Sequence, residues 1–560
     1  MPDQGMIRQE IARLVSEAAQ KARESGGLPS VALPEIEIEH PQRPDHGDYA
    51  SSLALRLARA AGAKPLDLAQ EIARHIPPHD AVGDVSVAAP GFINFRLSET
   101  WLARQVEEIR AAADDFGSVP LGEGKSFQVE YVSANPTGPL HVGNGRWAAM
   151  GSTLANVLAA AGYRVQQEYF VNDMLTQVET FARTLYARYQ QLFGVPAEIP
   201  ADGYPGEYVI DLAEEIRAEH GDRFLGPREF GPEPPPEFRT MGINKMLRSI
   251  ADDLVAMRIT FDVWYRESTL YGQDSRYDKA MALLREKGYV TQKEGAVWFT
   301  SSALGEDKDN VLVRSTGNPT YFASDIAYHY DKFLVRGFDR VVNIWGADHQ
   351  GHVSRLKAAL VAMDVDPSRL DVIIGQLVTL RRGGEVVRIS KRAGEIVTLR
   401  EVVDEVGADA CRFFFLTRSA DATVDFDLEL AKQRSAENPV YYVQYANARI
   451  AGILSLGLER GINYSDGDVA LLTHPAEMAL IRKMLRLPEL VELMARTLEP
   501  HHLAHYALEL ATVFHDFYEK CRVVTDDVPL TKARLKLVEA ARVTLGRTLS
   551  LMAVTAPEHM

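Results

Sequence analysis

Two short segments, far apart in the chain, carry side chains that are suited to binding phosphate. The first is His141-Val142-Gly143-Asn144, which lies between a predicted strand and a predicted helix. His141 and Asn144 can donate hydrogen bonds to anionic oxygens, and Gly143 lets a ligand lie close against the backbone. A helix N-terminus adds unpaired N–H groups and a partial positive charge. An ordinary helix capped by a histidine explains the same residues, so this motif alone does not decide.

The second segment, residues 388–394, reads Arg-Ile-Ser-Lys-Arg-Ala-Gly. Three cations within five residues, on a loop bounded by glycine, suit a triphosphate whose charge shifts during a reaction. On its own, such a charge run is usually a solvated surface. The two segments together, in this order, are far more specific than either one.

The first segment sits inside a predicted β-α-β unit. Residues 127–133 alternate between two faces as a strand does, and the prolines and glycine of residues 135–139 end it. From Gly143 onward, apolar residues recur at steps of three and four, which predicts a helix over about 141–162. Residues 163–170 are predicted to form the second strand.

Three regions follow from the wider pattern. Residues 125–425 alternate strands and helices, which indicates a parallel sheet with crossovers, interrupted by an insertion at about 187–245. Residues 1–118 are predicted to form a small α+β domain, and residues 435–560, without strand signals, a helical bundle. The predicted fold class is therefore α/β, flanked by an N-terminal α+β domain and a C-terminal all-α bundle.

Some finer assignments can be checked directly against a structure. We expect a helix over residues 49–61, a hairpin formed by strands 371–380 and 386–389, and a single helix over 476–497. Thr398 and Glu401 have the spacing of a capping box, which predicts the start of another helix.

Composition limits the class of protein. The chain has 560 residues, of which 46% are hydrophobic and 25% charged, as in ordinary globular proteins of several domains. No run of eighteen apolar residues is present, and two distant cysteines, Cys411 and Cys521, frame neither a small disulfide fold nor a Cys-rich zinc site. We expect a cytoplasmic protein with no zinc and no membrane contact. The net charge of −16 argues against DNA and nonspecific nucleic-acid binding, but not against local basic patches for one RNA.

Both phosphate-binding segments resemble the two signatures of class I aminoacyl-tRNA synthetases, and the longer stretch 133–143 resembles the arginyl-tRNA synthetase version. Asn144 stands where the family has its last His, and Arg388 where it has its first Lys, while Lys391 is retained. The first signature comprises Ala134, Asn135, Pro136, Thr137, Gly138, Pro139, Leu140, His141, Val142, Gly143 and Asn144.

The resemblance implies a Rossmann-type catalytic core and a two-step reaction. The carboxylate of arginine attacks the α-phosphate of MgATP, and the arginyl group then passes to the 3′ end of tRNA(Arg). The implied catalytic residues are His141, Asn144 and Lys391. The implied ATP-binding residues are His141, Gly143, Asn144, Gly346, Asp348, Arg388, Ser390 and Lys391. Asp348 could instead only cap the following helix.

The resemblance also implies an arginine site. Residues 321–329 are similar to the helix of the family that holds the amino acid. The implied arginine-binding residues are Glu130, Ser133, Asn135, Tyr321, Asp325, Tyr328 and Gln350. Packing in the core is the simpler explanation for Tyr321 and Tyr328. A site built for a guanidinium rejects Leu and Ile through unpaired charge, so no editing domain is expected.

Further stretches resemble the parts of this family that bind tRNA. Residues 46–58 and 89–95 are similar to the N-terminal domain that touches the outer corner of tRNA, although a generic capping domain would also fit. Residues 441–450 are similar to the anticodon-binding domain, and their aromatic residues with Arg449 could stack on splayed bases. We expect a monomer. A small-molecule nucleotidyltransferase and a noncatalytic tRNA-binding paralogue remain the alternatives.

Overall fold

A five-stranded parallel sheet forms the centre of the protein. In this computed structural model, which describes residues 6–225, 233–387 and 397–560, its strand order is β12-β11-β5-β6-β7, and every neighbouring pair is parallel. The strands are β5 (Ser126–Glu130), β6 (Arg164–Val171), β7 (Val263–Arg266), β11 (Arg340–Gly346) and β12 (Leu370–Gly375). The predicted α/β class is confirmed.

Helix α5 (Val142–Ala160) is buried on almost every side, which its small residues allow. A Cβ atom on Gly151 would lie 2.2 Å from the ring of Tyr131, and one on Gly145 would lie 2.4 Å from Leu399. Strand β5 ends at Glu130, earlier than predicted, because Val132 and Ser133 adopt positive φ angles of 68° and 40°. The chain thus turns sharply between the sheet and the helix N-terminus.

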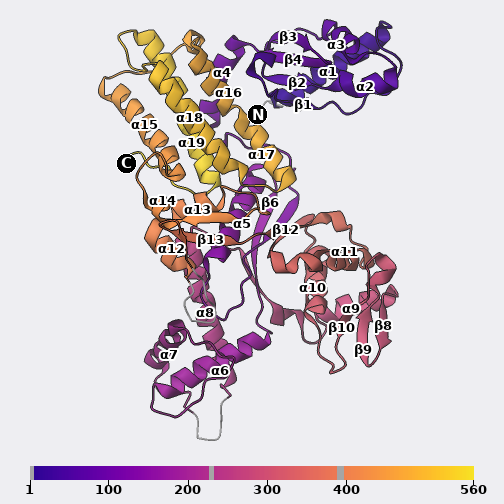
Figure 1. Cartoon of the computed structure of the whole chain (residues 1–560), viewed down its shortest axis with the longest axis vertical. Coiled ribbons are helices and arrows are strands. Elements are labelled where there is room, and N and C mark those ends of the chain that lie inside the picture. The colour runs from indigo at the N-terminus through magenta and orange to yellow at the C-terminus, as the bar shows by residue number, and fades with distance from the viewer. Residues whose placement is uncertain (1–5, 226–232, 388–396) are drawn as a thin grey trace.

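The N-terminal region is an antiparallel sheet covered by helices. The sheet order is β1-β2-β4-β3. Its elements are α1 (Ile7–Glu24), β1 (Ile38–Glu39), β2 (Tyr49–Ser51), α2 (Leu53–Ala61), α3 (Pro65–Arg74), β3 (Val82–Ala88) and β4 (Phe92–Leu97). The predicted helix over 49–61 is wrong at its start, because residues 49–51 pair with β4 as a strand. Helix α4 (Glu99–Ala112) leaves this region and packs against the C-terminal bundle (Figure 1).

Two groups of elements extend from the parallel sheet. The helices α6 (Thr176–Gln191), α7 (Glu207–His220) and α8 (Pro236–Ala256) lie at the end of the molecule opposite the N-terminal region, between β6 and β7 in sequence (Figure 1). The second group follows β7 and surrounds a three-stranded antiparallel sheet. It consists of α9 (Arg276–Glu286), β8 (Val290–Lys293), β9 (Ala296–Phe299), β10 (Asn310–Val313), α10 (Tyr321–Tyr330) and, after β11, α11 (Val353–Ala362).

The predicted strand over 371–380 is in fact two strands in different sheets. Strand β12 ends at Gly375, where an added Cβ atom would lie 2.0 Å from the ring of Trp147. Strand β13 (Val378–Arg382) then forms the predicted hairpin with β14 (Glu385–Val386) and pairs in parallel with β15 (Val424–Asp427). The intervening helices are α12 (Leu399–Val406) and α13 (Ala408–Phe415). The capping box of Thr398 and Glu401 is confirmed.

The C-terminal region is a helical bundle, as predicted. After α14 (Leu428–Lys432) it contains α15 (Pro439–Glu459), α16 (Pro475–Met484), α17 (Arg486–Thr497), α18 (His502–Lys520) and α19 (Val528–Leu551). The predicted helix over 476–497 breaks at Leu485 into α16 and α17. Pro488 then lies in the first turn of α17, the part of a helix in which a proline is tolerated. Among the helices of the described ranges, none is long and apolar enough to cross a bilayer.

Candidate functional site

The N-terminus of α5 is closed by a reciprocal pair of hydrogen bonds. The Nδ1 atom of His141 accepts a hydrogen bond from the backbone N–H of Gly143 at 3.1 Å. In return, the side-chain oxygen of Asn144 accepts one from the backbone N–H of His141 at 3.1 Å. Because Nδ1 is an acceptor, the proton of a neutral His141 ring sits on Nε2, which is then a donor. The histidine cap considered from sequence is therefore present, and it fixes the ring.

The described chain after the second signature packs against this same loop. Thr398 forms an isolated antiparallel bridge with His141, and the backbone N–H of Leu399 donates to the carbonyl of Leu140 at 2.7 Å. Before the segment, the N–H of Val387 donates to the carbonyl of Leu380 at 2.9 Å. Arg388, Ser390 and Lys391 themselves lie outside the described residues. The chain that follows them is nonetheless held against the first signature.

Gly346 is the last residue of β11, the strand beside β5, and Asp348 and Gln350 follow it. They lie at the carboxyl edge of a parallel sheet, where open α/β folds bind ligands. The side chains of Asp348 and Gln350 are exposed. Helix α11 begins after His352, so Asp348 is not its N-terminal cap.

Glu130 is buried at the end of β5 and is paired with a buried lysine. Its Oε2 atom lies 2.6 Å from the Nζ atom of Lys332, which also donates to the side-chain oxygen of Asn343 at 3.0 Å. Burial raises the pKa of Glu130, while the ammonium group of Lys332 opposes that rise. The Ser133 hydroxyl donates a hydrogen bond to Glu130 at 3.3 Å. It also accepts one from the backbone N–H of Phe170 at 3.1 Å, which ties the turn after β5 to β6.

Asn135 stands further out on the same loop. Its side-chain amide donates to the side-chain oxygen of Gln177 on α6 at 2.8 Å. Glu130, Ser133 and Asn135 thus precede the N-terminus of α5 on one continuous stretch of chain. This stretch connects the residues expected to bind the amino acid with those expected to bind ATP.

The two tyrosines of α10 have different environments. The ring of Tyr328 is buried between Phe170 and Tyr265, and its hydroxyl donates to Glu168. Tyr321, at the first turn of α10, is 59% exposed. The core-packing alternative therefore describes Tyr328 well and does not describe Tyr321.

Asp325 lies on α10, one turn after Tyr321. Its Oδ2 atom is 2.5 Å from the Nε2 atom of His352, and about a quarter of its side chain is exposed. Its negative charge contributes to raising the pKa of both Glu130 and Glu267. The structure therefore brings Asp325 close to a carboxylate that sequence reasoning predicted and to one that it missed.

The missed residue, Glu267, follows the end of β7 in a short 3-10 turn (Glu267–Leu270). Only 4% of its surface is exposed, and within the described residues its Oε2 atom has no hydrogen-bond partner. Burial raises the pKa of Glu267, with a hydrogen bond from Ser324 opposing the rise. No motif marks this glutamate. Its position after a sheet strand is the one sequence signal that could have suggested it.

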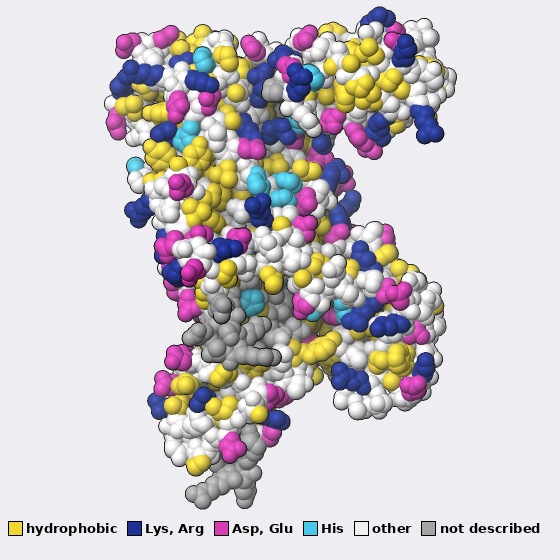
Figure 2. Space-filling view, viewed as in Figure 1, with side chains coloured by type: hydrophobic (Ala, Val, Ile, Leu, Met, Phe, Trp, Pro, Cys, Tyr) yellow, Lys and Arg dark blue, Asp and Glu magenta, His cyan; other side chains and the backbone are white. Residues whose placement is uncertain are grey.

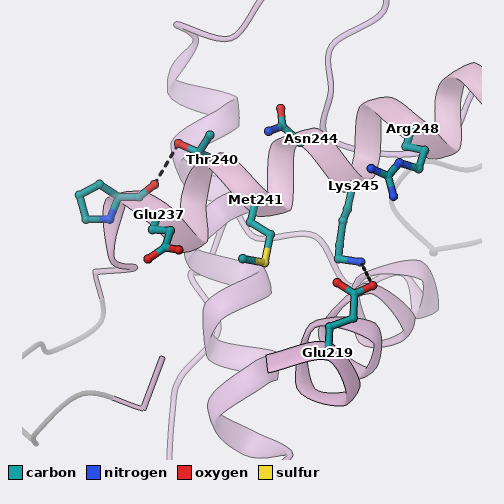
Figure 3. Close-up of a pocket in the computed structure, with 8 residues that line it drawn as sticks. Glu219, Glu237, Thr240, Met241, Asn244, Lys245 and Arg248 are labelled. Carbon is teal, nitrogen blue, oxygen red and sulfur yellow. Dashed lines mark hydrogen bonds and ion pairs between the residues drawn. The ribbon is translucent and has the colours of Figure 1, made fainter. Parts of the chain in front are cut away.

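A separate hollow lies between α7 and α8 (Figure 3). It has a volume of about 540 Å³ and is lined by Glu219, Pro236, Glu237, Thr240, Met241, Asn244, Lys245 and Arg248. Its lysine, Lys245, already pairs with Glu219 at 2.8 Å and with Glu215 at 3.2 Å. None of the predicted site residues lines it, so this hollow belongs to the insertion and not to the candidate site.

Three family models match the chain in succession. The first, "Arginyl tRNA synthetase N terminal domain", matches residues 7–97. The second, "tRNA synthetases class I (R), catalytic domain", matches residues 105–415, and the third, "DALR anticodon binding domain", matches residues 443–560. The second model begins at residue 105, inside the predicted N-terminal region of residues 1–118.

Whole-chain relatives agree with these models. The chain is 54% identical to an arginine–tRNA ligase of Dehalococcoides mccartyi and 46% identical to that of Heliobacterium modesticaldum, each over 99% of both chains. Among solved structures, a putative arginyl-tRNA synthetase of Campylobacter jejuni is 32% identical with a TM-score of 0.75, covering 83% of this chain and 100% of its own. The Thermus thermophilus enzyme, at 23% identity, has a TM-score of 0.77 over 99% of this chain and 100% of its own. The chain belongs to the arginyl-tRNA synthetase family of class I synthetases, and it activates arginine with ATP and charges tRNA.

Proposed function

We propose that the guanidinium group of arginine binds between Asp325 and Glu267, beside the exposed Tyr321. The observation that carries this assignment is the buried Glu267 after the end of β7, whose Oε2 atom has no hydrogen-bond partner among the described residues; the charge of Asp325 on α10 contributes to the raised pKa of this carboxyl. Like charges brought together out of water are unfavourable until a cation joins them. A planar guanidinium, with five N–H donors, suits these two carboxylates, one of which has an oxygen without a partner in the described part of the chain.

The other charged groups of the amino acid are assigned to the loop after β5. Glu130, Ser133 and Asn135 would hold the α-amino end of arginine, next to the N-terminus of α5. Because Lys332 already balances the charge of Glu130, this end needs less cationic compensation than the guanidinium end. Gln350, exposed just after β11, is a further proposed contact, and the buried Tyr328 would support the amino-acid site from the core.

ATP is assigned to the N-terminus of α5 and the end of β11. His141, with Nε2 as a donor, and Asn144 would bind phosphate and ribose, Gly143 would lie against the nucleotide, and Gly346 and Asp348 would contact its far side. Arg388, Ser390 and Lys391 would hold the β- and γ-phosphates as pyrophosphate leaves, with Mg²⁺ as part of the MgATP substrate. The protein then supplies positioning and charge neutralisation, and the nucleophile is arginine's own carboxylate.

The tRNA is assigned to the N-terminal domain and the bundle, with domain limits of 1–118, 125–425 and 435–560. On α15, Arg449 lies 4.8 Å from the ring of Tyr445 and 4.6 Å from the ring of Tyr518, and both tyrosines are about 40% exposed. Exposed aromatic rings with an arginine are suited to stacking on unpaired bases. On the face shown in Figure 2, basic and acidic side chains are interspersed, so on this face tRNA(Arg) would meet local contacts and not one basic field. We propose a cytoplasmic monomer.

The arginine assignment is tested by Asp325→Asn. The variant keeps the size of the side chain but removes its charge and replaces one acceptor oxygen with an NH2 group that faces the N–H donors of the substrate, so the KM for arginine should rise by about 100-fold, roughly 3 kcal/mol. The KM for ATP should change little. Asp371→Asn is the matched control, since Asp371 pairs with Arg340 near the opposite, amino edge of the same sheet.

Steady-state ATP–pyrophosphate exchange with tRNA present measures both constants, and a melting curve is recorded beside it. A variant that melts earlier while its KM for arginine stays at the wild-type value would show that Asp325 only braces α10.

A further inference from the structure

The Asp325 carboxylate is held by one neighbouring side chain. The Nε2 atom of His352 approaches its Oδ2 atom at 2.5 Å, and within the described ranges Asp325 has no other side-chain hydrogen bond. His352 is buried, with Phe322 and Trp345 both 5.7 Å from its ring centre. It comes from the turn that precedes α11, whereas Asp325 lies on α10. The contact therefore joins an element that precedes β11 in the chain to one that follows it.

The opposite edge of the His352 ring shows which nitrogen carries the proton. Arg355, one turn further along, donates from its Nε atom to the Nδ1 atom of His352 at 2.8 Å, and a second guanidinium nitrogen also contacts Nδ1. A guanidinium has only donors, so Nδ1 must be an acceptor. The proton of the neutral ring is then on Nε2, and it points to Asp325.

We propose that His352 is a positioning residue for arginine recognition: a neutral donor, oriented by Arg355, that fixes the Asp325 carboxylate without cancelling its charge. This inference rests on the proposed role of Asp325. A lysine or arginine in direct contact with Asp325 would fix it equally well but would compete with the guanidinium of the substrate. The imidazole occupies one carboxylate oxygen and leaves the negative charge for the ligand.

The arrangement also keeps Arg355 out of direct contact with the substrate. Its guanidinium stacks over the ring of Phe322 at 5.0 Å and reaches the Asn310 side chain on β10 at 3.4 Å. The imidazole of His352 thus separates two cations, Arg355 and the substrate, that would otherwise repel each other across Asp325.

Substitutions at His352 in the full-length enzyme test the proposal. His352→Leu removes the donor but keeps an apolar side chain, and the KM for arginine should rise by about tenfold to a hundredfold, with the KM for ATP unchanged. His352→Gln can present an amide N–H near the position of Nε2 and should recover most of this loss. His352→Lys keeps a donor but adds charge, and should be as impaired as His352→Leu. His220→Leu, at a histidine 3.6 Å from Glu219 on α7, is the matched control.

A double-mutant cycle with Asp325→Asn separates this inference from the proposed function. If His352 acts through Asp325, the double variant His352→Leu with Asp325→Asn should have a KM for arginine no higher than that of Asp325→Asn alone. If Asp325→Asn leaves the KM for arginine unchanged, the proposed arginine site itself fails. If Asp325→Asn impairs arginine use but Leu, Gln and Lys at position 352 all behave alike, only the positioning role is overturned. The comparison of Gln with Lys stands even where the leucine variant does not fold.

Discussion

Replacing Glu267 with glutamine should make the enzyme more stable and less able to use arginine. Glu267 is 4% exposed, and its Oε2 atom has no partner among the described residues. Leaving a buried polar group unpaired costs about 1–3 kcal/mol, more when the group is charged. A neutral amide relieves part of this cost, so a gain of about 1 kcal/mol is expected, which shifts Tm by roughly 1–2 °C in a domain of about 300 residues.

The same change should weaken arginine binding. A hydrogen bond to a charged partner contributes about 1.5–3 kcal/mol, so the KM for arginine should rise by about tenfold to a hundredfold. A residue that merely braces the fold would lose stability and leave the KM unchanged. A variant that gains stability while its KM for arginine rises is therefore expected only if Glu267 faces the substrate.

The pH dependence of stability gives a second check. Burial raises the pKa of Glu267 above its ordinary value of 4.5. Below pH 4.5 the Glu267 carboxyl is protonated in both the folded and the unfolded protein, so it does not affect the free energy of unfolding. As the pH rises, this carboxyl ionises first in the unfolded protein, and the folded state loses stability. The advantage of Glu267→Gln should thus be absent at low pH and grow as the pH rises above this value. Chemical denaturation of both proteins across this range measures it. A glutamine variant that is less stable at neutral pH and has a normal KM for arginine would refute the reasoning.

Three further outcomes are expected. His141→Ala should lower the rate of adenylate formation by about 10²- to 10⁴-fold in single-turnover assays, with arginine affinity little changed; near-normal turnover would remove His141 from the mechanism. Lys391→Ala should reduce ATP–pyrophosphate exchange more than Arg388→Ala at saturating ATP, and the reverse order would mean that this signature is misaligned. Lys332→Met should destabilise the protein by about 3–5 kcal/mol in denaturant melts by stranding Glu130, and adding Glu130→Gln should restore part of this loss; additive losses would contradict the pairing.

The sequence predicted the elements that local patterns specify. The β-α-β unit around His141, the parallel sheet and the C-terminal bundle all follow from periodicity and from turn residues. Periodicity does not say which sheet a strand joins, so the stretch 371–380 was predicted as one strand although Gly375 ends it against Trp147. The strand at Tyr49 depends on pairing with β4, which lies more than forty residues away in the chain.

The candidate site was predictable where chemistry and spacing coincide in one segment. His141, Gly143 and Asn144 form such a segment, and the structure holds the residues after the second signature against it. Glu267 lies in no motif, and its proximity to Asp325 arises only from folding. The pairing of Glu130 with Lys332 joins residues 202 positions apart, a contact that no local pattern encodes.

The arrangement of arginine in the pocket is tested most directly by a crystal structure with a nonhydrolysable arginyl-adenylate analogue. The guanidinium should lie within hydrogen-bond distance of both Asp325 and Glu267, with His352 still bound to Asp325 through Nε2. The phosphate of the analogue should lie against the N-terminus of α5, within reach of His141. An analogue whose guanidinium lies away from these two carboxylates would contradict the account.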